Sequence, residues 1–242
     1  MRPIAILQHE AAQGPGFLQD YLLGHGLPFR LFKPAQELNG PLHARDFSGI
    51  VVLGSNHSIH DELPWIGAEL QLLQDALEHD VPVLGHCFGA QLLACAMGAQ
   101  VRRNACAQIG WSRVWITPAA QASMGQRTQA LLFHWHYDSF TLPRGAKRTM
   151  YGQYCLNKGF VHGRHCGFQG HLEVTQASVR AWCLEGREEL AQAQGPAVQT
   201  EAQILHALPE RTRELHRIAD HAYSAWTQGL TRPCSVAVHS HG

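Results

Sequence analysis

Short apolar runs alternate with segments of helical spacing along the first half of the chain. The short runs predict four strands, at 3–9, 29–32, 48–53 and 81–84. The run at 48–53 is apolar almost throughout, which is typical of a strand buried on both faces of a parallel sheet. Apolar residues at every third or fourth position predict three helices, at 16–23, 63–78 and 88–97. This alternation predicts a mostly parallel central sheet with helices on both faces.

The second half of the chain has a different pattern. Alternating apolar and polar residues at 109–117 predict an outer strand. Shorter runs predict three more strands, at 131–135, 148–151 and 164–169. From residue 175 onward the spacing is helical and predicts two long helices, separated by a break at 192–199. Residues 1–242 are interpreted as a single domain, with an α/β core at about 1–175 and a helical C-terminal extension at about 176–232.

Composition narrows the function classes. The chain has 242 residues, and 19 lysines and arginines balance 19 aspartates and glutamates, so no basic surface for nucleic acid is expected. No apolar stretch reaches the ~18 residues of a membrane-spanning helix, and the apolar run at the N-terminus is short for a signal peptide. The seven cysteines are odd in number and form no C-x-x-C pair, which favours a reducing, cytoplasmic location.

The strongest local signal lies at 82–91 (PVLGHCFGAQ), where a predicted strand passes through Gly85-x-Cys87-x-Gly89 into a predicted helix. A nucleophile elbow has this layout, because its turn residue is strained and flanking glycines allow close approach of the backbone. The helix N-terminus favours the thiolate of Cys87, and the N–H of Phe88 would point at a developing oxyanion. The alternative is a structural cysteine in a tight turn, the role we assign to Cys95 within its apolar helix.

A cysteine nucleophile needs a base and a group that orients the base. His171 and Glu173 stand at alternate positions of an extended segment, so their side chains share one face. The same spacing occurs in His60-Asp-Glu62, but Glu62 stands at the start of a predicted helix, where an acidic residue serves the helix dipole. We therefore expect Cys87, His171 and Glu173 to act together.

These paired motifs resemble those of the class I glutamine amidotransferases, and in particular the stand-alone members similar to the glutaminase domain of GMP synthase. The similarity covers most of the chain and rests on two motifs, Gly85-x-Cys87-x-Gly89-x-Gln91 and Gln169-x-His171-x-Glu173. Five further segments agree with it: 52–55 (VLGS), 61–66 (DELPWI), 109–111 (IGW), 135–143 (WHYDSFTLP) and 168–175 (FQGHLEVT). The resemblance implies a flavodoxin-like fold, and it implies no cofactor.

The resemblance also implies a reaction. Cys87 would attack the side-chain amide of L-glutamine and form a γ-glutamyl thioester, His171 would relay the proton to ammonia, and Glu173 would orient His171. Water would then release glutamate. The residues implied to bind the oxyanion or the substrate are Gly54, Ser55, Phe88, Gln91, Trp135, His136 and Tyr137.

Three positions depart from the family pattern. The family usually has Gly-Gly-Pro where this chain has Gly54-Ser55-Asn56, and an aromatic residue where it has Gly170. It often has Gln-Ala-Phe where this chain has Lys158-Gly159-Phe160. Each departure would change the fit of the substrate without touching the triad.

Two alternatives use the same fold. A γ-glutamyl peptidase would cleave γ-glutamyl peptides with the same triad, and Gly170 in place of an aromatic residue is compatible with room for a larger leaving group. A non-catalytic binding or regulatory module is favoured only by Ser55 in the oxyanion loop.

The sequence also bears on partners and metals. No phosphate-binding G-x-x-x-x-G-K-[ST] loop and no synthetase domain after Glu173 are found in this sequence, so the ammonia would either pass to a synthetase partner chain or be released. Three histidine groups, His134-x-His136, His162-Gly-Arg-His165-Cys166 and His239-Ser-His241, do not complete a four-ligand zinc pattern. We therefore expect no metal.

Overall fold

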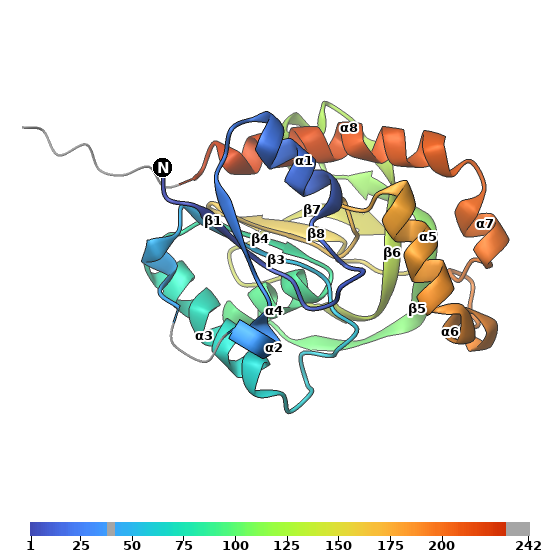
Figure 1. Cartoon of the computed structure of the whole chain (residues 1–242). Coiled ribbons are helices and arrows are strands. Elements are labelled where there is room, and N and C mark those ends of the chain that lie inside the picture. The colour runs from blue at the N-terminus through green and yellow to red at the C-terminus, as the bar shows by residue number, and fades with distance from the viewer. Residues whose placement is uncertain (38–41, 231–242) are drawn as a thin grey trace, which may run out of the picture.

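A single nine-stranded sheet organises the part of the chain that the structure describes, residues 1–37 and 42–230 of this computed structural model (Figure 1). Its order is β2-β1-β3-β4-β9-β8-β7-β5-β6. The strands are β1 (Ile4–Leu7), β2 (Phe29–Phe32), β3 (Gly49–Val52), β4 (Val83–His86), β5 (Val101–Ile116), β6 (Gln129–Phe140), β7 (Lys147–Gly152), β8 (Gly159–His162) and β9 (His165–Phe168). The helices are α1 (Gly16–Gly24), α2 (Pro34–Glu37), α3 (Pro64–Glu78), α4 (Phe88–Ala96), α5 (Gln176–Glu185), α6 (Arg187–Gln192), α7 (Glu201–Leu205) and α8 (Leu208–Thr227).

The first five strands of this order, β2-β1-β3-β4-β9, are all parallel. Each has four residues, and β1, β3 and β4 are buried along their whole length, as expected where helices cover both faces of a sheet. The strands and helices predicted from the first half of the sequence are confirmed here. This region has the strand order of a flavodoxin-like sheet.

The remaining strands, β8, β7, β5 and β6, pair in antiparallel fashion. The strand predicted at 109–117 is longer, because β5 pairs with β6 from Val101 onward across an irregularity between Arg103 and Gln108. It is also not outermost: β7 and β6 flank it, and β6 forms the edge. Alternating apolar and polar residues show that one face of a strand is polar, but they do not show whether the strand lies at the edge of the sheet. The sequence missed β8, a short strand that forms a hairpin with β9.

The C-terminal helical segment is divided more often than its periodicity predicted. The first predicted helix ends at Glu185 and resumes as α6 after Gly186, whose backbone approaches the ring of Trp135. The second is split into α7 and α8 near Ala207, which has a positive φ of 51°. The apolar spacing continues across both breaks, so periodicity alone does not reveal them.

Two apolar layers enclose the sheet (Figure 1). Along β1, Ile4 and Ile6 face the layer under α1, α5 and α8, whereas Ala5 and Leu7 face the layer under α3 and α4. Helices on both faces are therefore confirmed. In the described residues, no helix is long and apolar enough to cross a membrane. Cys234, the pair His239 and His241, and the end of the predicted extension at 231–232 lie outside the described residues.

Candidate active site

A sharp turn between β4 and α4 presents Cys87. Its φ of 50° and ψ of −107° are strained for a residue with a side chain. A Cβ on Gly85 would lie 2.5 Å from the carbonyl carbon of Gly89, and one on Gly89 would lie 2.1 Å from the carbonyl oxygen of Val52. Only glycine fits at either position, because β3, β4 and the first turn of α4 meet there. The spacing Gly85-x-Cys87-x-Gly89 thus follows from backbone crowding around the elbow.

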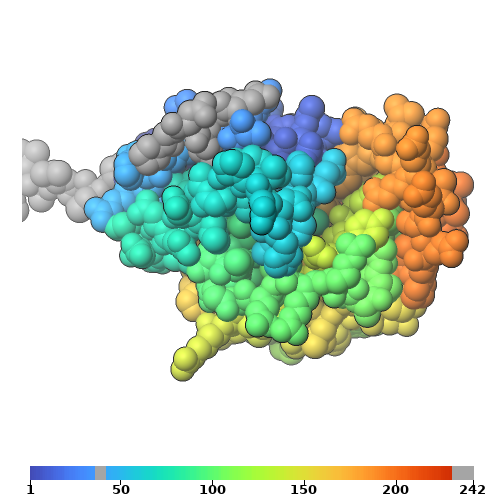
Figure 2. All heavy atoms as spheres, turned by 90° about the horizontal axis from the view of Figure 1, so that it is seen from below, coloured from blue at the N-terminus to red at the C-terminus, as the bar shows by residue number. Residues whose placement is uncertain are grey.

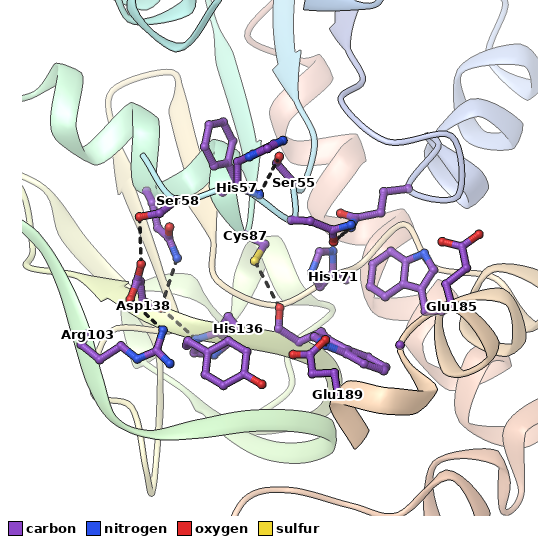
Figure 3. A pocket seen from close by; sticks show the side chains of 18 of the residues that line it. Ser55, His57, Ser58, Cys87, Arg103, His136, Asp138, His171, Glu185 and Glu189 are labelled. Carbon is purple, nitrogen blue, oxygen red and sulfur yellow. Dashed lines mark hydrogen bonds and ion pairs between the residues drawn. The ribbon is translucent and has the colours of Figure 1, made fainter. Parts of the chain in front are cut away.

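His171 and Glu173 reach the same place from the end of β9. The Nδ1 atom of His171 lies 2.7 Å from Oε1 of Glu173, and both side chains are buried. The backbone N–H of His171 donates to the carbonyl of Phe133, which ties the loop to β6. The rings of Trp182 and His171 pack almost at right angles, with 4.7 Å between ring centroids. In Figure 3 the imidazole of His171 lies beside the sulfur of Cys87, and the two groups interact electrostatically.

Electrostatics favour a charged pair at this position. Burial alone would lower the pKa of His171, but the Glu173 carboxylate and the Cys87 sulfur together raise it to about 10. Burial alone would raise the pKa of Glu173, but the neighbouring imidazoles of His86 and His171 lower it to about 2. His86 Nδ1 lies 3.3 Å from Oε2 of Glu173, so the carboxylate sits between two imidazoles. Burial lowers the pKa of His86, which favours its neutral form.

The predicted oxyanion loop passes close to the imidazole. A Cβ on Gly54 would lie 2.8 Å from Cε1 of His171, so this position also requires glycine. Ser55 lines the cavity, and its hydroxyl accepts from the backbone N–H of His57 at 3.1 Å. On the other side of Cys87, Phe88 is the first residue of α4, and the first N–H groups of a helix have no acceptor within it.

A cavity of about 470 Å³ opens above the Cys87 sulfur (Figure 3). On the face seen in Figure 2, the segment after β3, strand β5 and the helices α5 and α6 surround a hollow. The predicted residues that line the cavity are Ser55, Cys87, Phe88, Gln91, Trp135, His136, Tyr137 and His171. Gly54 and Glu173 lie behind this wall.

The predicted binding residues are held in place by contacts with neighbouring residues. The amide nitrogen of Gln91 donates to the carbonyl of Asp138 at 3.1 Å and to Oε1 of Gln169 at 3.3 Å. The carbonyl of Trp135 accepts from the Cys87 thiol at 3.8 Å. The guanidinium of Arg103 covers the ring of Tyr137, 4.3 Å from its centroid.

Sequence reasoning missed a large part of the cavity wall. The additional residues are Gln13, Asn56, His57, Ser58, Arg103, Asp138, Trp182, Glu185, Gly186, Glu188 and Glu189. Five of these come from α5, α6 and the glycine between them, a segment interpreted from the sequence only as an extension. Asp138 carried a signal, since it belongs to the segment 135–143 on which the resemblance rests.

Gly170 does not enlarge the cavity. It is buried and does not line it, and a Cβ there would lie 2.8 Å from Cε1 of His134. The interpretation of Gly170 as room for a leaving group is therefore wrong. His134 fills the space onto which a larger residue at position 170 would project.

Within the described residues, His134, His136 and His165 contact other side chains of this chain. The imidazoles of His134 and His136 both contact the ammonium group of Lys158. His165 Nε2 lies 3.9 Å from Asp80. Among the described residues, a cluster of three metal-binding residue types, Asp75, Glu78 and His79, lies at the end of α3 and does not line the cavity.

Known proteins and solved structures resemble this chain over most of its length. The family model described as "Glutamine amidotransferase class-I" matches residues 18–185. Among solved structures, a glutamine amido transferase from Methylobacillus flagellatus superposes with a TM-score of 0.93 at 39% identity, over 96% of each chain.

Curated relatives carry several names. The glutamine amidotransferase-like protein YfeJ of Salmonella typhimurium is 30% identical over 64% of this chain and 69% of its own length. A γ-glutamyl-L-1-hydroxyisopropylamide hydrolase from Pseudomonas sp. is 30% identical over 59% of this chain and 52% of its own. The glutamine-hydrolysing GMP synthase of Azoarcus sp. is 30% identical over 61% of this chain, but only 29% of its own length is covered.

Proposed function

Because the chain belongs to the class I glutamine amidotransferase family, we propose that it hydrolyses γ-glutamyl amides through Cys87, with L-glutamine as the first substrate. The observation that carries this proposal is the position of the His171 imidazole, which lies beside the Cys87 sulfur (Figure 3) and forms a hydrogen bond with the Glu173 carboxylate. Such an arrangement supplies a nucleophile, a base and a group that orients the base. The cavity above the sulfur supplies the place for the substrate.

The proposed reaction has two halves. The Cys87 thiolate attacks the γ-carbonyl carbon, and its oxygen becomes an oxyanion bound by the N–H of Phe88 and an N–H of the Gly54-Ser55 turn. The imidazolium of His171 donates its proton to the leaving amine, the C–N bond breaks, and a γ-glutamyl thioester remains on Cys87. A water molecule then gives a proton to His171 and attacks the thioester, which releases glutamate and the thiolate. Glu173 keeps Nδ1 of His171 as a donor throughout.

A second candidate is the hydrolysis of γ-glutamyl amides or peptides with a larger leaving group. The volume of about 470 Å³ supports it, because pockets of roughly 300–1,000 Å³ hold ligands larger than one amino acid. The printed name of the Pseudomonas relative also describes a substituted γ-glutamyl amide. The proposed residues and steps are the same, and only the amine differs.

Ammonia would leave the site for a synthetase partner chain or for solvent. The relation to GMP synthase supports a synthetase partner. We further propose a cytoplasmic location, which the six unpaired cysteines of the described residues support. We also propose that the α/β core and the helical extension belong to one domain.

The test is glutamate release by the purified protein from L-glutamine, from a γ-glutamyl dipeptide and from a γ-glutamyl alkylamide. Cys87→Ala is the negative control, and Cys95→Ala, on the same helix but outside this cavity, is the matched control. Release from glutamine that depends on Cys87 supports the first candidate, and release from the other two substrates alone supports the second. If none of the three is hydrolysed by folded protein, the proposal fails and a non-catalytic role gains support.

A further inference from the structure

Lys158 is a buried cation behind the cavity. It lies just before β8, and its side chain is fully buried. Its Nζ atom contacts three groups, at 2.5 Å from Oε1 of Gln108, 3.2 Å from Nδ1 of His134 and 3.1 Å from Nε2 of His136. None of the ion pairs formed by the described residues includes it. A buried ammonium group without a carboxylate is costly, so such a group calls for a functional explanation.

The three contacts specify how the protons are arranged. An ammonium group has three donors, and here it faces three acceptors. Nδ1 of His136 donates to the carbonyl of Asp138 at 2.9 Å, which leaves Nε2 free to accept from Lys158. Burial and the charge of Lys158 hold the pKa values of His134 and His136 well below their usual range. Both imidazoles are thus neutral acceptors, and both nitrogens of His136 are engaged although its ring lines the cavity.

Gln169 lies between Lys158 and Cys87 and contacts both. The backbone N–H of Gln169 donates to the carbonyl of Lys158 at 3.0 Å, and its side-chain amide lies 3.7 Å from the Cys87 sulfur. Burial lowers the pKa of Lys158 to about 8, while negative charge on the sulfurs of Cys155, Cys87 and Cys106 acts to raise it. Gln169 thus contacts both residues, and the charges of Lys158 and Cys87 act on each other.

We propose that Lys158 is a positioning residue of the active site, whose buried ammonium group stabilises the thiolate of Cys87 and fixes the neutral tautomer of His136 in the cavity wall. Lys158 exchanges no proton with the substrate. The proposal rests on Cys87 being the nucleophile. Lys158 contacts Gln108 on β5 and His134 and His136 on β6. The sulfurs of Cys106 on β5, Cys155 after β7 and Cys87 on the elbow act on its charge.

The first test measures Lys158 itself. The chain has three lysines, Lys33, Lys147 and Lys158, so ¹³C-labelled lysine gives few NMR signals to assign. The Lys158 signal is expected to titrate near pH 8, and its midpoint should move to lower pH in Cys87→Ala, because linkage between two charges is reciprocal. An unchanged midpoint in the folded Cys87→Ala protein would overturn the proposal.

The second test measures Cys87. In Lys158→Gln, iodoacetamide should alkylate Cys87 about fivefold more slowly than in the wild type at pH 7. The difference should shrink above pH 8, where Lys158 loses its proton in the wild type. Lys147→Gln, at an exposed lysine, is the matched control and should behave as the wild type. If the alkylation rate of Cys87 in Lys158→Gln depended on pH in the same way as in the wild type, Lys158 would have a merely structural role and the proposal would fail.

Neither test uses a substrate, so a protein that hydrolyses no γ-glutamyl compound can still pass both. If Lys158→Gln does not fold, the NMR titration of the wild type and Cys87→Ala still decides the proposal.

Discussion

The parallel and the antiparallel half of the sheet contribute to the site in different ways. The parallel half, β2-β1-β3-β4-β9, places Cys87 and His171 at strand ends, where close backbone approach at Gly85 and Gly89 fixes the elbow and Gly54 makes room for the His171 ring. The antiparallel half contributes a cluster of buried polar side chains that contact one another, Gln108, His134, His136 and Lys158. Reactive groups are thus set by backbone geometry over a few residues, whereas the wall depends on side chains brought together from distant strands and helices.

The largest expected effect comes from the elbow. Cys87→Ala should lower the turnover of γ-glutamyl amides by about 10⁵-fold or more, because the nucleophile cannot be replaced by its neighbours. Steady-state glutamate release measures it. Cys95→Ala, on the same helix, should change turnover by less than about twofold. Appreciable activity in folded Cys87→Ala would show that the parallel half does not hold the nucleophile.

Loss of the orienting carboxylate should have a smaller effect. Glu173→Gln is expected to lower turnover by about 10³- to 10⁴-fold, because His171 keeps its place but loses the acceptor that sets its tautomer. The same assay measures it. A loss as large as that of Cys87→Ala would mean that Glu173 does more than orient the base.

The same pair predicts how stability depends on pH. The pKa of Glu173 is lowered to about 2, so its contribution is present above its ordinary value and is lost as pH falls toward 2. The pKa of His171 is raised to about 10, so its contribution is complete below its ordinary value and is lost as pH rises toward 10. Urea unfolding should therefore find Glu173→Gln about 3 kcal/mol less stable than the wild type near pH 5.5, and the gap should close toward both extremes. A gap that does not vary with pH would contradict the charged pair.

The packing of the antiparallel half can be tested from Gly170, which follows β9 and lies against His134 of β6. Gly170→Ala should cost about 1–3 kcal/mol of unfolding free energy, since its Cβ would contact His134 at 2.8 Å. Gly67→Ala, on α3 with open space around it, should instead stabilise by up to ~1 kcal/mol. Thermal and urea unfolding compare the two variants. Equal effects would mean that His134 moves freely and that the wall is not tightly packed.

The features that the sequence predicts also differ between these two parts of the site. The elbow and the pair His171 and Glu173 were predictable, because strand–turn–helix order and a spacing of two are local features. The walls supplied by α5 and α6 were not, since Glu185 and Glu189 reach the cavity only through tertiary packing. Lys158 was noticed as a departure, but nothing in the sequence indicates that it meets His134 and His136.

The most direct test of the central claim is the mass of the protein during turnover. Acid quenching of the wild type with a γ-glutamyl amide, followed by peptide mass spectrometry, should find one γ-glutamyl group on the peptide that contains Cys87. The group should be absent from Cys87→Ala and from protein without substrate. Turnover with no γ-glutamyl group on Cys87, or undiminished in Cys87→Ala, would contradict the account.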